Sequence, residues 1–189
     1  MTIVQVMPED DRDSVLERTT DPAVIAGLLA PYGITLRQWQ TRELAADAGQ
    51  EEVIAAYRTE IDEVCAAGGY RLVDVVRMVP DPDSAQWREQ AVAARAKFLN
   101  EHRHAEDEVR FFVEGRGCFY LHLGDKVYAV VCERGDLISV PAGTTHWFDM
   151  GASPEFCAIR FFEREDGWIG DFTGDEIGSR MPNLDELLA

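Results

Sequence analysis

Six short segments rich in β-branched and aromatic residues follow one another in the second half of the chain, and they limit the fold more than any other feature. Glycines separate them, and Gly124-Asp125 suits a two-residue hairpin turn. Strands this short at regular spacing are typical of a small antiparallel barrel or a double-sheet jelly roll. The expected strands cover residues 109–113, 117–123, 126–132, 136–140, 145–149 and 156–163.

The first residues predict one short strand and one helix. Residues 3–6 are extended in character. Pro22 suits the first turn of a helix, either Thr20 or Asp21 can cap it, and Gly33 lies just beyond its end. We therefore expect a helix that begins near Pro22.

The next stretch carries apolar residues at helical intervals from 38 to 67. Gly49 falls inside it and is the expected break between two helices. Residues 70–79 are rich in β-branched side chains and predict a strand.

A third helix is expected over residues 85–98, capped by Asp83 or Ser84. The tail is rich in turn residues and acids, with a short helix expected at 184–188. At 189 residues the chain fits one domain. We predict a mainly β fold with N-terminal helices: a helical part over about 20–98, a barrel core over about 70–79 and 100–165, and a tail over 166–189.

The charge of the chain argues against polyanionic partners. Its formal net charge is -17, so contact with nucleic acid or an anionic membrane surface would release no counterions from that surface. No apolar run approaches the roughly 18 residues of a membrane span, and the start lacks the pattern of a signal peptide. We expect a cytoplasmic protein that acts on a small molecule.

The four cysteines, Cys65, Cys118, Cys132 and Cys157, form no CxxC pair. Their spacing favours neither a zinc knuckle nor a disulfide framework. The last three lie in apolar, strand-like surroundings, and we expect them to be buried thiols.

Three of the four histidines cluster near a glutamate. His102 and His104 have the same parity in an extended segment and project to one side, as does Glu108. His146 follows a Pro-x-Gly turn and can bring a third imidazole to the same point. Three nitrogens and one carboxylate oxygen suit a divalent first-row ion and are poor ligands for calcium. We therefore predict a metal site.

A longer pattern supports this prediction. His-x-His, three residues, Glu, six residues and Gly115 form a first motif; Gly135, five residues and Pro-x-Gly-x-x-His, ending at His146, form a second. These two motifs resemble the signature of the cupin superfamily, which implies a double-stranded β-helix barrel. His122 lies outside the pattern, and we expect a structural or surface role for it.

Within the cupins, residues 98–111 and 141–149 closely resemble the acireductone dioxygenases of methionine salvage. The resemblance continues through 158–162 and Gly167-Trp168. The resemblance is strong in the C-terminal half of the chain. The helical N-terminal half resembles the family mainly in the order of its expected elements.

The resemblance implies a substrate and two sets of products. The substrate is the acireductone 1,2-dihydroxy-3-keto-5-methylthiopentene, which is cleaved by O2. With Fe²⁺ the products are 4-methylthio-2-oxobutanoate and formate; with Ni²⁺ they are 3-methylthiopropanoate, formate and CO. One ion per chain would be held by His102, His104, Glu108 and His146.

The resemblance also implies roles for residues around the ion. Arginines would contact the anionic oxygens of the substrate, and aromatic side chains would wall its pocket. Two acids are singled out by their position beside the ligands and not by the resemblance: they could accept histidine N–H groups, take the enediol proton, or simply be solvated acids. The arginines are Arg110 and Arg160, the aromatic residues Phe98, Phe148 and Trp168, and the acids Glu101 and Asp107.

Two alternatives stay open on the sequence alone. One is another cupin dioxygenase or decarboxylase acting on a small acid. The other is a non-catalytic cupin that binds a small ligand, although such a protein has no need of open metal positions. We expect a monomer or a weak homodimer.

Overall fold

The computed structural model describes every residue except 82 and 167, so Gly167 of the family-like stretch lies outside the described residues. Strands dominate the described chain, which confirms the mainly β prediction. No described helix combines the length and apolar character that crossing a bilayer requires.

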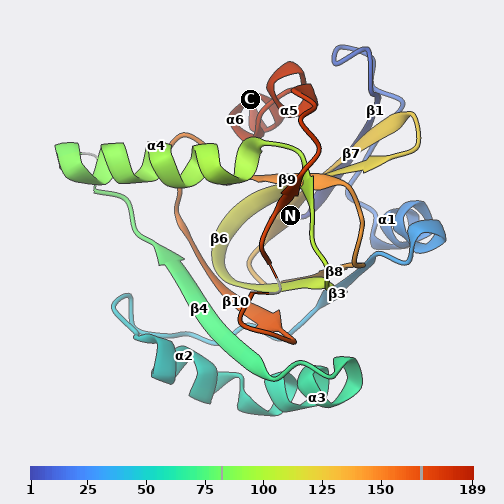
Figure 1. Ribbon diagram of the computed structural model, residues 1–189. Coiled ribbons are helices and arrows are strands. Elements are labelled where there is room, and N and C mark those ends of the chain that lie inside the picture. The colour runs from blue at the N-terminus through green and yellow to red at the C-terminus, as the bar shows by residue number, and fades with distance from the viewer. Residues whose placement is uncertain (82, 167) are drawn as a thin grey trace.

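Two sheets share one long strand, β6 (Glu108–Leu123), and curve around a common interior (Figure 1). The first half of β6 pairs with β8 and β10, and its second half pairs with β7 and β9. The other strands are β1 (Ile3–Pro8), β2 (Glu17–Thr19), β3 (Thr35–Gln38), β4 (Leu72–Met78), β5 (His102–Arg103), β7 (Lys126–Glu133), β8 (Asp136–Val140), β9 (His146–Asp149), β10 (Phe156–Phe162) and β11 (Asp171–Phe172).

The shared strand corrects one prediction. Residues 109–113 and 117–123 were expected as separate strands, but they are one strand that bends at Gly115. Gly115 has φ of +68°, and a Cβ there would lie 1.9 Å from the carbonyl oxygen of Glu155. A glycine at this point therefore lets β6 pass from one sheet into the other instead of ending.

The helices cover the outside of the sheets. Asp21 caps α1 by accepting from the amides of Ala23 and Val24, and Ser84 caps α4 by accepting from Trp87 N–H. α4 crosses next to β9, whereas α2 lies against β4 (Figure 1). The helices are α1 (Pro22–Leu29), the 3-10 helix η1 (Ala30–Tyr32), α2 (Gln50–Ala56), α3 (Arg58–Gly68), α4 (Ala85–Leu99), α5 (Ile177–Arg180) and α6 (Leu184–Leu188).

The prediction of a helix between 38 and 48 is wrong. Residues 35–38 form β3 against β8, and residues 39–49 are not helical. Gly49 caps α2, and the break between the two helices falls at Tyr57. Trp39 packs against Phe111 on the outer face of the sheet, with 4.5 Å between the ring centroids. Packing of this segment against the sheet overrides its helical periodicity.

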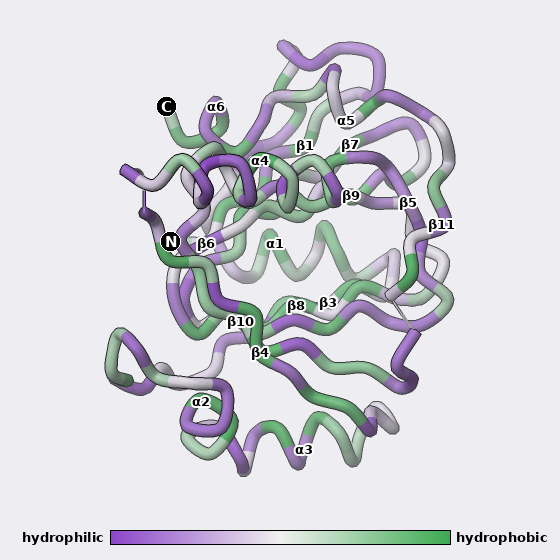
Figure 2. Tube along the Cα trace, turned by 60° about the vertical axis from the view of Figure 1, so that its left-hand side comes forward, coloured by the Kyte–Doolittle hydropathy of each residue, from purple (hydrophilic) through white to green (hydrophobic). Residues whose placement is uncertain are grey.

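Alternation along the strands divides the core into layers. In β10, Phe156 and Ala158 face the interior between the sheets, whereas Ile159 and Phe161 face outward and are covered by α2 and α3. Apolar and polar residues accordingly recur at intervals along α3 (Figure 2). A third cluster, which includes the stacked pair Tyr120 and Trp147, lies beneath α5 and α6. β9 is thereby packed on both faces, through Trp147 on one side and Phe148 on the other.

The cysteines agree with their prediction. All four are free thiols, and Cys118, Cys132 and Cys157 are fully buried.

Candidate metal centre

Three short segments bring the predicted ligands together at one end of the barrel. β5 carries His102 and leads directly to His104, β6 begins at Glu108, and β9 begins at His146. His102 and His146 are register partners across β5 and β9. The amide of Gly143 donates to the carbonyl of His104 at 2.9 Å, so the two motifs are also joined through the backbone.

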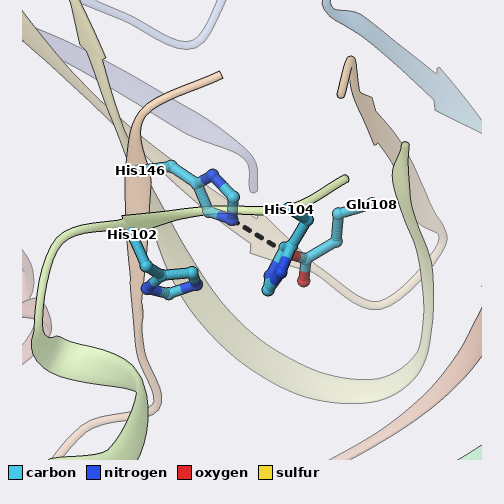
Figure 3. A group of neighbouring side chains, drawn as sticks. All are labelled: His102, His104, Glu108 and His146. Carbon is cyan, nitrogen blue, oxygen red and sulfur yellow. Dashed lines mark hydrogen bonds and ion pairs between the residues drawn. The ribbon is translucent and has the colours of Figure 1, made fainter. Parts of the chain in front are cut away.

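The four side chains converge on one point (Figure 3). All four are buried, and one ligand atom from each lies within 4.8 Å of the others. Residues 105–107 leave the strand conformation, yet the short loop returns Glu108 to the side of the histidines. The structure thus brings together all four residues that the sequence singled out as ligands.

Main-chain carbonyls orient the three imidazoles. The Nδ1–H of His102 donates to Asn100 O at 2.7 Å, and that of His146 donates to Thr144 O at 2.8 Å. His104 Nδ1 faces Ile169 O at 3.4 Å. An imidazole held through Nδ1 presents Nε2 as its ligand atom.

The Nε2 atoms of two histidines face the same carboxylate oxygen. His146 Nε2 lies 2.9 Å from Glu108 Oε2, and His104 Nε2 lies 3.3 Å from it. The other oxygen, Oε1, accepts from Arg110 Nη2 at 2.7 Å. Glu108 is therefore the point where the imidazoles and the buried guanidinium meet.

The pKa shifts of His102 and Glu108 suit a cation. Burial lowers the pKa of His102 to about 4, so its imidazole is neutral near pH 7. Burial alone would raise the pKa of Glu108, but Arg110 and the hydrogen bonds from His104 and His146 hold it well below its usual range. Three imidazole nitrogens and one carboxylate form a donor set that fits Fe²⁺, Ni²⁺ or another divalent first-row ion.

Arg110 lies two residues after Glu108 on β6 and, like it, is buried inside the barrel. Its guanidinium is surrounded by rings, 4.3 Å from the centroid of Phe148, 5.1 Å from Phe119 and 5.5 Å from Trp168. Burial lowers the pKa of Arg110, and Glu108 opposes that shift. A fixed positive charge therefore stands beside the cluster in water-poor surroundings.

Arg160 lies opposite Arg110 across β10 and β6. It forms a two-point ion pair with Asp74, with nitrogen–oxygen distances of 2.8 and 2.6 Å. Its guanidinium also lies 5.6 Å from the ring of Trp168. Arg160 and Trp168 both line a cavity of about 470 Å³, and so does Ile169, whose carbonyl faces His104.

The three predicted wall residues lie at different depths. Trp168 is nearly parallel to His104, with 6.0 Å between ring centroids. Phe148 is buried beneath Arg110. Phe98 is partly buried and packs against the interior core.

The two acids beside the ligands are held by other groups. Asp107 accepts from the amide of Ala142 at 2.9 Å and faces the hydroxyl of Tyr70 at 3.5 Å. Glu101 accepts from Thr173 and from His122. The carbonyls of Asn100, Thr144 and Ile169 take the place that the sequence suggested for these acids beside the histidine N–H groups.

Several residues that contact the site were not identified from the sequence. The carbonyl of Ile169 and the hydroxyl of Thr173 reach the site from a C-terminal segment without a recognisable motif. His122, for which a structural or surface role was expected, contacts the carboxylate of Glu101, the residue that precedes His102 in the chain. The only sequence signal for His122 was that the chain has just four histidines.

Comparison with known proteins assigns the family. The ARD/ARD' family model matches residues 2–170. Acireductone dioxygenase 1 of Nocardia farcinica is 72% identical over 188 residues and is aligned over the full length of both chains. Acireductone dioxygenase 2 of the same organism is 57% identical, covering 100% of this chain and 98% of the relative.

A solved structure agrees. The acireductone dioxygenase from Bacillus anthracis with a cadmium ion in its active centre superposes with a TM-score of 0.75 and 26% identity. The match covers 91% of this chain and 98% of the other.

Proposed function

Because the chain belongs to the ARD/ARD' family and is an acireductone dioxygenase, we propose that it cleaves 1,2-dihydroxy-3-keto-5-methylthiopentene with one Fe²⁺ or Ni²⁺ per chain. His102, His104, Glu108 and His146 would hold the ion. The observation that carries the proposal is their convergence within 4.8 Å at a buried point beside Arg110. Family membership selects this reaction over the other cupin dioxygenase, decarboxylase and ligand-binding alternatives.

The ion, when bound, supplies a Lewis acid and a template on which two substrate oxygens can chelate. An ion held by these four side chains would keep further coordination positions for those oxygens. Which two oxygens chelate would decide which carbons O2 bridges, and this choice would separate the Fe²⁺ products from the Ni²⁺ products.

The protein supplies charge and exclusion of water. We assign Arg110 to the anionic oxygens of the enediolate, since its guanidinium is buried and already beside Glu108. Phe98, Phe148 and Trp168 would surround the methylthio tail. We assign Arg160 to the mouth of the site, where its pair with Asp74 fixes it against Trp168.

The remaining assignments complete the proposal. The two sheets that share β6 agree with a double-stranded β-helix barrel of the cupin type, with the N-terminal helices packed outside it as one domain over 1–189. We propose a cytoplasmic enzyme of methionine salvage, a monomer or a weak homodimer, with the substrate and O2 as its partners and neither nucleic acid nor membrane among them.

Oxygen uptake tests the proposal directly. Metal-free protein loaded with Fe²⁺ or Ni²⁺ is mixed anaerobically with synthetic acireductone and then aerated. We expect O2 uptake with both ions, the keto acid with Fe²⁺, and CO with Ni²⁺. Electrode measurements together with product identification check this result.

Protein without added metal and free ions without protein are the controls. Failure of the Fe²⁺-loaded protein to consume O2 above both controls would refute the substrate assignment. Identical products with the two ions would refute the metal-dependent choice of chelating oxygens.

Asp107 provides a separate prediction. We propose that it holds the turn before His146, because its carboxylate accepts from Ala142 N–H. Asp107→Asn keeps an oxygen for that bond and should retain turnover within about threefold, whereas Asp107→Ala should lose about tenfold in metal affinity. Steady-state O2 uptake and metal titration measure the two effects.

The same pair of variants separates this role from that of a base. An amide cannot take the enediol proton. A loss of turnover in Asp107→Asn as large as that in Asp107→Ala, with metal affinity intact, would therefore identify Asp107 as the base.

A further inference from the structure

His122, the fourth histidine, lies between two carboxylates. Its Nδ1–H donates to Glu101 Oε2 at 2.5 Å, and its Nε2–H donates to Glu9 Oε2 at 2.7 Å. The contact with Glu101 is the inner one, because the Glu101 side chain is 4% exposed whereas that of Glu9 is 46% exposed. Burial opposes protonation of His122, but the two carboxylates raise its pKa. Since a carboxylate only accepts hydrogen bonds, each ring nitrogen is the donor in its contact.

Glu101 is also held from the C-terminal side. Its Oε1 accepts from the hydroxyl of Thr173 at 2.6 Å, and its main-chain carbonyl accepts from the amide of Thr173 at 3.1 Å. Both carboxylate oxygens of this buried residue are thus occupied, one by β6 and one by the segment after β11. Glu101 immediately precedes the ligand His102 in the chain.

The strand that carries His102 is short. β5 contains two residues, and its register pairs are His102 with His146 and with Phe172, and Arg103 with Asp171. A strand with so few ladder hydrogen bonds is weakly fixed by its own backbone. The side-chain contacts of Glu101 therefore add restraint where β5 begins.

We propose that His122 and Thr173 are positioning residues which act through Glu101 to fix His102 for metal binding. The inference rests on the metal centre of the proposed function. Metal sites require ligand placement within about 0.5 Å, and groups that orient ligands typically change metal affinity by ten- to a hundredfold. A restraint on the residue next to a ligand acts on that same placement.

Metal affinity tests the inference without relying on turnover. His122→Phe keeps a planar ring but removes both hydrogen bonds, and we expect the Kd for Ni²⁺ to rise about tenfold. Thr173→Val removes the hydroxyl that bonds Glu101 at nearly constant volume and should raise the Kd about threefold. The thermal midpoint is measured with and without Ni²⁺, and the visible spectrum is recorded with Co²⁺.

A purely structural role gives a different result. It lowers the midpoints of the metal-free and Ni²⁺-loaded proteins equally, leaving the Kd and the Ni²⁺-induced rise in midpoint unchanged. A positioning role reduces that rise and alters the Co²⁺ spectrum. Thr173→Val leaves His122 paired with Glu101, so it also tests the proposal in a variant without an unpaired buried carboxylate.

Glu9→Gln is the matched control. It changes only the outer contact of His122, so its Kd for Ni²⁺ should equal that of the wild type. Wild-type affinity in both His122→Phe and Thr173→Val would overturn the inference and leave the proposed function standing. Failure of the wild type to bind Ni²⁺ or Fe²⁺ would overturn the metal centre itself.

Discussion

Glu108→Gln should abolish metal retention and lower kcat/KM at least about a hundredfold, which exceeds the usual cost of losing an outer partner of a ligand. The amide removes the negative charge on which His104, His146 and Arg110 converge. It also leaves the guanidinium of Arg110 buried without a carboxylate. Elemental analysis after dialysis and O2 uptake measure the two losses.

Glu51→Gln is the matched control, because Glu51 is an exposed acid in the first turn of α2. It should keep one ion per chain and full turnover. The thermal midpoint of metal-free Glu108→Gln separates loss of the site from loss of the fold. A folded Glu108→Gln protein that retains a stoichiometric ion after dialysis would contradict the assignment of Glu108 as a ligand.

Asp149→Ala should cause the largest loss of stability. Asp149 is fully buried at the end of β9 and pairs with Arg95 of α4 through nitrogen–oxygen contacts of 2.7 and 2.9 Å. It also accepts from the amides of Leu184 and Gly151. Removing one partner of such a pair costs about 3 kcal/mol, which corresponds to a fall of roughly 6–12 °C in Tm.

Chemical denaturation and calorimetry measure that loss, and Asp62→Ala is the control. Asp62 pairs with Arg58 at 3.9 Å on the exposed face of α3, where one such contact is worth at most about 0.5 kcal/mol. Equal losses in the two variants would contradict a special role for the buried pair.

The stability that Asp149 contributes to the fold decreases in acid. Burial would raise its pKa, but Arg95 and the two amides lower it below the ordinary value. The folded state therefore binds a proton less readily than the unfolded state, whose Asp pKa is about 3.9. The stability that Asp149 contributes is present above about pH 4 and is lost as the pH falls further. The difference in free energy of unfolding between the wild type and Asp149→Ala should therefore become smaller as the pH falls below about 4.

The sequence predicted the elements whose cause is local. Runs of β-branched residues predicted β7, β8 and β10. The cap candidates Thr20 or Asp21 and Asp83 or Ser84 marked the starts of α1 and α4, where the structure uses Asp21 and Ser84. The metal ligands were recognisable for a similar reason. His102, His104 and Glu108 lie within seven residues, and the turn before His146 has its own motif. The types and spacing of these residues were therefore enough to predict the donor atoms of the site.

Helical periodicity misled the prediction where the cause was not local. Residues 39–49 have apolar positions at helical intervals, but Trp39 and Leu44 meet the outer face of a sheet built from residues far along the chain. Gly115 resembles a strand break, and only the approach of Glu155 explains why it is a bend within β6.

By itself, the sequence determined the donor set, the mainly β fold and the family, because these depend on residue types at short spacings. The tertiary structure decided what surrounds the donors. It paired Arg160 with Asp74, brought the carbonyl of Ile169 to His104, and placed His122 against Glu101. Each of these contacts joins residues at least 21 positions apart. Their partners are selected by the curvature of the sheets and the packing of the tail, which no local pattern of residues encodes.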